Sequence, residues 1–169
     1  LAHFFWLRLA KDAGWLADFT AVFGDASADG GAALARHQAG GPPADWDAHF
    51  VSAYASAHPW EDWAETTAHF LHAAEGLHTA RALGLSLTEL KLEVERFPRG
   101  TLPADVPAAQ AATFLGTVDD WVRLALLVNE LNRALGMPDA YPFVISAPVV
   151  SKLWFVQRSF ATLARPRAA

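Results

Sequence analysis

The spacing of apolar residues most constrains the fold of this chain. Large apolar side chains recur at a helical period along most of the sequence. No segment alternates apolar and polar residues with a hairpin turn between two partners, so strands are not expected. Glycine and proline divide the helical pattern into segments. The sequence therefore predicts an all-α, multi-helix fold, with helices at about 1–12, 15–23, 31–39, 44–55, 59–84, 108–135 and 148–163 and a shorter one opening at 86–89.

The size and apolar content of the chain predict one domain. Its 169 residues are 53% hydrophobic and include seven tryptophans, which is enough to bury a substantial core. We therefore expect a single domain over 1–169. The segment at about 97–107 contains three prolines and a glycine and is predicted to be a flexible loop.

Charge and residue usage exclude several kinds of partner. The net charge of -5 leaves no basic patch for a phosphate backbone, so nucleic acid is not an expected partner. No apolar run reaches the roughly 20 residues that span a bilayer, which predicts a cytoplasmic chain without a membrane partner. Cysteine is absent, so a bound metal would need imidazole and carboxylate ligands. Zinc fits such ligands best, followed by iron or manganese.

One stripe of the predicted helix at 59–84 carries acids and imidazoles in register. At 3.6 residues per turn, Glu61, Glu65, His69 and His72 lie on the same side of this helix. A buried carboxylate must be paired, protonated or bound to a metal, so the stripe is either a solvated face or a site. Bulky apolar residues on the same helix favour its being covered by the rest of the domain.

Three long strings of the sequence match a known family. They are GPPADW at 41–46, FVSAYASAHPWEDWAE at 50–65 and LNRALGMPDAYPF at 131–143. With these strings the chain resembles the zinc-binding metallopeptidases whose bacterial members often carry an N-terminal zinc ribbon ahead of a HExxH-type catalytic domain. The resemblance extends over nearly the whole chain and is weakest at about 86–112. It implies a zincin-like helical catalytic domain.

The resemblance also implies ligands for one catalytic zinc ion. The opening residues look like the end of the family's His-Glu-x-Gly-His motif, with His3 as the second histidine and Ala2 in place of the usual glycine. The first histidine and the general-base glutamate would then lie upstream of Leu1. In glutamate-type zincins the third ligand is a carboxylate from a later helix. Here Glu61 is the expected ligand, with Glu65 as its competitor.

Further roles follow from a similar pattern in the lethal-factor-like peptidases, where a tyrosine seven residues before the ligand glutamate faces the oxyanion. Tyr54 stands seven residues before Glu61 and is the expected hydrogen-bond donor, with His58 as the alternative donor. Glu65, with His69 one turn further along, is expected to support a ligand imidazole. Tyr54 also falls in an aromatic stripe, where it could equally be a core residue.

The function implied by this resemblance is zinc-dependent hydrolysis of peptide bonds in a peptide or protein substrate. Because one ligand and the general base are expected outside the chain, we expect weak zinc binding and negligible peptidase activity from these residues alone. Two other classes remain open. A helical binding or scaffold domain needs no site. A di-iron bundle could use the E-x-x-H string at 75–78 with Glu61, Glu65 and His72, but the sequence lacks a second such string.

Overall fold

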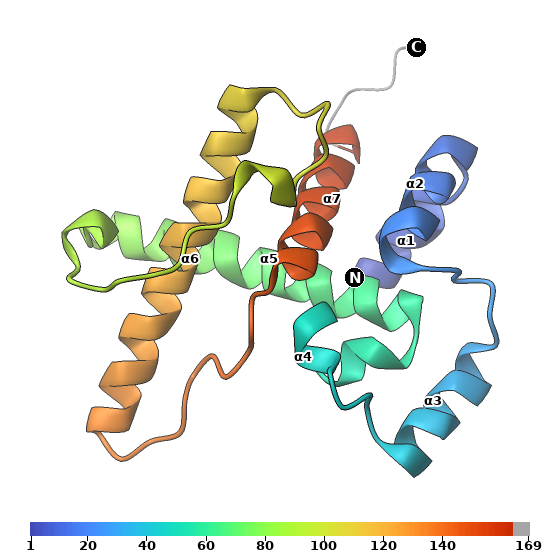
Figure 1. Cartoon of the computed structure of the whole chain (residues 1–169), viewed down its shortest axis with the longest axis horizontal. Helices are drawn as coiled ribbons and strands as arrows, with labels where there is room; N and C mark the ends of the chain where they lie inside the picture. The colour runs from blue at the N-terminus through green and yellow to red at the C-terminus, as the bar shows by residue number, and fades with distance from the viewer. Residues whose placement is uncertain (164–169) are drawn as a thin grey trace. The chain divides into compact units, whose positions relative to one another are not determined.

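The protein is helical throughout the part that the structure describes. The computed structural model describes residues 1–163 and contains no strand in that range (Figure 1), so the all-α prediction is confirmed. No helix in this range is both long and apolar enough to cross a bilayer. The helical elements are α1 (Ala2–Leu9), α2 (Ala13–Phe23), α3 (Gly30–Gly40), α4 (Trp46–His49), η1 (Tyr54–Ala57), α5 (Pro59–Ala82), η2 (Leu87–Glu89), η3 (Arg99–Thr101), α6 (Ala108–Ala134) and α7 (Ala147–Leu163).

The prediction of a single helix at 44–55 is wrong, because the structure has two short helical elements, α4 and η1, in this region. Helix α4 ends at His49, and Phe50 is extended with φ -129° and ψ 149°. The His49 carbonyl accepts a hydrogen bond of 2.8 Å from the Lys152 ammonium instead of continuing the helix. The Ser52 hydroxyl then accepts from the backbone N–H of Ala55, which stabilises the turn into η1. Tertiary contacts have overridden the local helical preference.

Two other segments also differ in detail from their predictions. The capping box at 86–89 opens only the short η2, and the Ser86 hydroxyl pairs with the Thr88 hydroxyl rather than capping the backbone. In the predicted loop, the Arg99 guanidinium donates to three backbone carbonyls, those of Leu102, Ala104 and Val106. The flexibility of this loop stays a prediction.

The chain groups into two compact units. The first contains residues 1–70 and the described residues from 146 onward, and the second contains 71–145. Helix α5 contributes its first turns to one unit and its last turns to the other. The prediction of a single domain stays a prediction.

Aromatic rings form the core of the first unit. Phe19, Trp63 and Phe155 are almost fully buried, and the ring centroids of Trp63 and Phe155 lie 6.2 Å apart in an edge-to-face arrangement. The indole N–H of Trp63 donates a 2.9 Å hydrogen bond to the Ala2 carbonyl at the start of α1. Since Trp63 belongs to α5, this bond joins the beginning of α1 to α5.

The second unit depends on a close approach between α5 and α6. Its buried cluster contains Leu77 and Ala80 of α5 and Leu124 of α6, with Trp121 packed against it. A Cβ atom added at Gly76 would lie 2.8 Å from the Trp121 ring. The absence of a side chain at Gly76 therefore allows the indole to lie against α5.

We predict that Gly76→Ala lowers the free energy of unfolding by about 1–3 kcal/mol, because the new methyl group overlaps the Trp121 ring. Urea denaturation measures the change. The matched control is Gly116→Ala on α6, where no atom lies within 4 Å of the added Cβ. Its higher helix propensity should stabilise the protein by about 0.5–1 kcal/mol. Equal effects of the two substitutions would contradict this role of Gly76.

Candidate functional site

His3 and Glu61 meet at the start of α1 and the first turn of α5. The His3 Nε2 atom lies 3.8 Å from a carboxylate oxygen of Glu61. This nitrogen is buried and has no hydrogen-bond partner among the described residues. The imidazole packs on the Trp60 indole with ring centroids 4.3 Å apart. The packing and the Trp63 bond to Ala2 fix the ring so that its unpaired nitrogen faces a carboxylate.

This arrangement fits two ligands of a zinc ion. Imidazole nitrogen and carboxylate oxygen bind zinc at about 2.0–2.2 Å, which places two tetrahedral donors roughly 3.4 Å apart. The observed 3.8 Å requires only a small side-chain movement to reach that spacing. The described residues contain no group of three or more candidate metal ligands. They therefore supply a ligand pair, whereas a catalytic zinc uses three protein ligands.

Tyr54 lies beside the same carboxylate. Burial raises the pKa of its hydroxyl, and the negative charge of Glu61 and a hydrogen bond to Glu61 raise it further, with a smaller effect from Glu65. Tyr54 is 41% exposed, so the residue lies at the surface of the first unit. The structure thus places Tyr54, Glu61 and His3 close together, and their roles stay predictions.

Glu65 is held by a serine of the segment that leads to Tyr54. The Ser52 hydroxyl donates a 2.9 Å hydrogen bond to the Glu65 carboxylate. Ser52 was not among the residues singled out from the sequence, where a serine in a run of small residues gives no distinctive signal. His69 is buried in α5, with 4% of its surface exposed. The support of a ligand imidazole by Glu65 and His69 stays a prediction.

His58 caps α5 with both of its ring nitrogens engaged. Nδ1 accepts a 3.1 Å hydrogen bond from the Trp60 backbone N–H, so the proton of the neutral ring is on Nε2. Nε2 lies 3.1 Å from the Ala28 carbonyl and donates to it. The side chain is buried. These bonds leave no free donor on His58 and favour Tyr54 as the donor at this site.

A buried ion pair next to the site was missed from the sequence. The Lys152 ammonium of α7 lies 2.6 Å from the Asp62 carboxylate of α5, with the side chains 8% and 0% exposed. Lys152 also lies 4.2 Å from the centroid of the Phe50 ring, and Thr66 donates to Asp62. Burial raises the pKa of Asp62 to about 6, although Lys152 and Thr66 act to lower it. The available signal was a lone lysine inside the apolar run at 148–156.

The residues of the di-iron alternative do not form a ligand set. His72, Glu75 and His78 lie on the part of α5 that belongs to the second unit. Among residues 1–163 no group of three or more histidine, aspartate or glutamate side chains could hold a metal ion. The structure therefore gives no support to a carboxylate-bridged pair of irons.

Comparison with known proteins identifies the family. A family model described as "Putative zinc-binding metallo-peptidase" matches residues 1–159. The chain belongs to this family. Its relatives include the uncharacterized protein Mb2598c of Mycobacterium bovis and the uncharacterized proteins MT2644 and Rv2568c of Mycobacterium tuberculosis. Each is 39% identical over 157 residues, which cover 92% of this chain and 42% of the relative. No solved structure matches the chain.

The His3–Glu61 pair lies within the part of the chain that matches this metallo-peptidase family. The family match includes every residue of the candidate site. The chain spans less than half of the length of these relatives. The relatives are themselves uncharacterized and assign no substrate.

We predict that Lys152→Met lowers the free energy of unfolding by about 3–5 kcal/mol at pH 7.5, because it leaves Asp62 buried without its cation. The fold already raises the pKa of Asp62 from 3.8 to about 6, so ionising this group costs stability as the pH rises through that range. Loss of Lys152 raises this pKa further. The deficit of the variant should therefore shrink as the pH falls towards 4.

Urea denaturation at pH 7.5 and pH 4.5 measures this deficit. The double variant Asp62→Asn with Lys152→Met is the control, because it removes both charges and should recover much of the loss at pH 7.5. A deficit of the same size at both pH values, or a double variant no better than Lys152→Met, would show that the charge of Asp62 is not its cause.

We also predict that Glu61→Gln lowers the pKa of Tyr54, because it removes a negative charge beside the hydroxyl. The chain contains only two tyrosines, so an ultraviolet absorbance titration can follow both phenols. Tyr141, whose pKa is raised by burial to about 12, serves as the internal reference and should not change. Glu75→Gln, which changes another glutamate of α5, is the control variant. An unchanged pKa of Tyr54 in Glu61→Gln would show that the Glu61 carboxylate does not act on the Tyr54 hydroxyl.

Proposed function

We propose that this chain forms part of the catalytic centre of a zinc-dependent peptidase, with His3 and Glu61 as zinc ligands. The observation that carries the proposal is the buried and unpaired His3 Nε2 atom, 3.8 Å from the Glu61 carboxylate. The His3 side chain is 40% exposed, but the Nε2 atom itself is buried, and a buried polar atom without a partner is costly unless a further group binds it. The family match supports zinc as that group.

The residues around the pair have distinct tasks in this proposal. Trp60 packs on the His3 ring and keeps it oriented, while Ser52 holds Glu65 beside the site. When bound, zinc supplies Lewis acidity for activating water and polarising a peptide carbonyl. The Tyr54 hydroxyl, next to Glu61, is placed to donate a hydrogen bond to the oxyanion that develops on the substrate. The hydroxyl is protonated at neutral pH, as a donor requires, because even the ordinary pKa of a tyrosine is about 10 and the shift here is upward.

The proposed substrate is a peptide or protein, hydrolysed in the cytoplasm with one zinc ion per chain. Among the described residues we assign two ligands and no general base. A two-ligand site lacks the third protein ligand of catalytic zinc centres, so we expect this chain by itself to bind zinc weakly and to hydrolyse peptides negligibly.

The test is a zinc titration in which isothermal calorimetry measures the binding affinity. We predict that His3→Ala and Glu61→Ala each weaken zinc binding by more than about tenfold, because each removes a donor atom. His78→Ala and Glu75→Ala are matched controls on α5 outside the site and should bind zinc as the unmodified chain does. Equal zinc affinity of the control and site variants would overturn the ligand assignment.

Tyr54→Phe tests in the same titration whether Tyr54 is a zinc ligand. Its pKa is influenced by the Glu61 carboxylate, but Tyr54 is not an assigned ligand. We therefore expect zinc affinity to be retained in this variant within about threefold. A loss as large as that of Glu61→Ala would move Tyr54 from the donor role to the ligand set.

A further inference from the structure

Helix α3 lies alongside η1, the short element that carries Tyr54. Both elements belong to the first unit and are in contact there. Near the start of α3, a Cβ atom added at Gly30 would lie 3.9 Å from the His58 ring, and His58 donates to the Ala28 carbonyl just before the helix. In the last turn of α3, the His37 imidazole meets the Tyr54 phenol with ring centroids 6.4 Å apart. These two contacts make α3 antiparallel to η1.

The spans of the two elements agree with this pairing. Gly30 and His37 are separated by about 10 Å along an α-helix, at 1.5 Å per residue. Tyr54 and His58 are separated by about 8 Å, at roughly 2.0 Å per residue of a 3₁₀-helix. Because the two spans are similar, a single helix can contact both ends of this segment.

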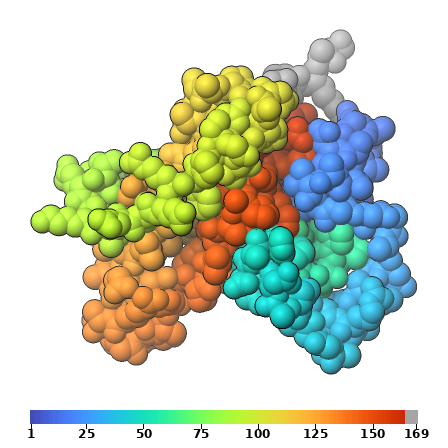
Figure 2. All heavy atoms as spheres, in the orientation of Figure 1, coloured from blue at the N-terminus to red at the C-terminus, as the bar shows by residue number. Residues whose placement is uncertain are grey.

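One face of α3 carries small residues and then the His37 ring. Gly30, Ala33 and His37 follow the i, i+3, i+7 spacing of a single helical face. Ala33 is the buried residue of α3, and Figure 2 shows this helix at the surface of the protein. Small residues at 30 and 33 allow a close approach to η1. The large ring of His37 then reaches Tyr54.

The Tyr54 ring depends on His37 for its orientation. Tyr54 is exposed and lies in an element of only four residues. Within residues 1–163 its one ring contact is with His37, at an interplanar angle of 88°. Edge-to-face pairs with centroids about 4.5–7 Å apart are attractive, whereas an exposed tyrosine without such a contact samples several χ1 rotamers. The His37 ring therefore restricts the rotamers of the phenol beside Glu61.

We propose that His37 is a positioning residue that holds the Tyr54 phenol in the rotamer that places its hydroxyl beside Glu61. This inference rests on the proposed function, in which Tyr54 donates a hydrogen bond to the substrate. A donor that is already oriented loses less conformational entropy when the substrate binds, and its hydroxyl is directed to one position.

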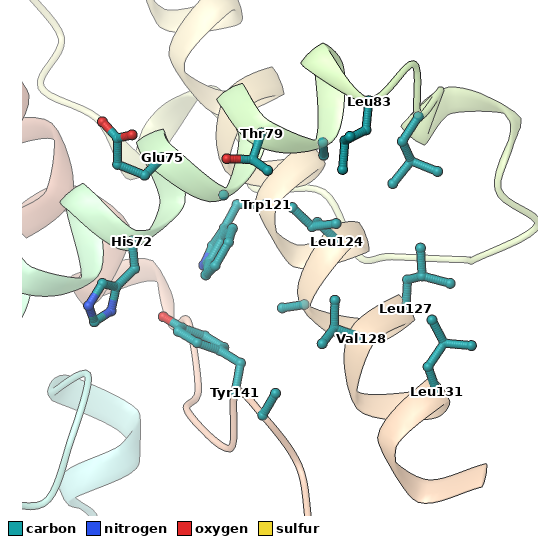
Figure 3. A pocket seen from close by; sticks show the side chains of 15 residues that line it. His72, Glu75, Thr79, Leu83, Trp121, Leu124, Leu127, Val128, Leu131 and Tyr141 are labelled. Atoms are coloured by element: carbon teal, nitrogen blue, oxygen red, sulfur yellow. The ribbon is translucent and has the colours of Figure 1, made fainter. Parts of the chain in front are cut away.

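The test is NMR spectroscopy of the full chain, without zinc, with tyrosine labelled by ¹³C and ¹⁵N. The couplings of the Cγ atom to the backbone nitrogen and to the carbonyl carbon report the χ1 populations of each tyrosine. The chain contains only two tyrosines, and a Tyr54→Phe sample assigns their signals. Tyr141 is the internal reference, because its ring lies against Trp121 in the second unit (Figure 3), with centroids 4.9 Å apart.

We expect one dominant χ1 rotamer for Tyr54 in the unmodified chain. His37→Ala should lower the ratio of this rotamer to the others by about two- to tenfold, because it removes the ring contact. His37→Phe should retain the ratio, because a phenyl edge replaces the imidazole edge. His78→Ala changes an exposed histidine of the second unit, so this matched control should leave Tyr54 unchanged. Circular dichroism and thermal melting confirm that the variants are folded.

Three results would overturn the positioning role of His37. The first is an averaged χ1 of Tyr54 in the unmodified chain. The second is a rotamer ratio that His37→Ala changes no more than His78→Ala does. The third is a loss of the dominant rotamer in His37→Phe as large as that in His37→Ala, which would show that ring packing is not the cause.

A zinc titration of His37→Ala separates this inference from the proposed function. We expect the zinc affinity to be retained within about threefold, because His37 is not an assigned ligand. A loss as large as that of Glu61→Ala would make His37 a ligand and overturn its positioning role. If the unmodified chain bound no zinc, the ligand assignment would fail, whereas the rotamer measurement would still decide whether His37 orients Tyr54.

Discussion

The buried pair of Asp62 and Lys152 joins the segments on which the candidate site depends. Lys152 projects from α7, reaches Asp62 on α5 and also donates to the His49 carbonyl at the end of α4. The chain between His49 and α5 carries Tyr54, and Asp62 is adjacent to Glu61. The Lys152 ammonium therefore holds both α5, which carries Glu61, and the end of α4, which leads to the segment that carries Tyr54. The Phe50 ring against the ammonium shields this pair from water.

This pair is better explained by geometry than by stability. Burial raises the pKa of Asp62 even though a lysine lies 2.6 Å away, which means that desolvation outweighs the attraction between the charges. Apolar residues of similar volume could fill the space at no greater cost. They could not specify the register between α5, α7 and the end of α4, because apolar contacts are non-directional. We infer that the ion pair is present because it selects one arrangement of these three segments.

Trp63 and Trp60 have a similar role on the other side of the site. The Trp63 indole is fully buried in the aromatic core, and its N–H donates to the carbonyl of Ala2. Ala2 is the residue before His3. Trp60 then packs against the His3 ring. Both tryptophans flank Glu61 and Asp62 in the sequence, so four consecutive residues of α5 serve the core, the ligand pair and the ion pair. The first turn of α5 therefore takes part in all three sets of contacts.

Local patterns were sufficient for much of this protein. The helical period and the Gly/Pro breaks predicted the long helices α5, α6 and α7 to within a few residues, because such amphipathic or apolar segments need only burial to be stable. The family strings pointed to His3, Glu61 and Tyr54, which the structure brings together. They also suggested His58 as a donor, but Nδ1 of its ring accepts from the Trp60 backbone at the start of α5 and Nε2 bonds the Ala28 carbonyl. A cap and a catalytic histidine have the same sequence signature at a helix start.

The sequence by itself determined the all-α class, the breaks between helices and the chemical character of the α5 stripe, because these depend on residue type and short-range spacing. Only the tertiary structure decided that the segment 44–55 divides into α4 and η1, that Ser52 pairs with Glu65 and that Lys152 pairs with Asp62. The contact between Lys152 and Asp62 joins residues that are 90 positions apart in the chain. Such a pairing depends on how helices pack, and no local period of the sequence records it.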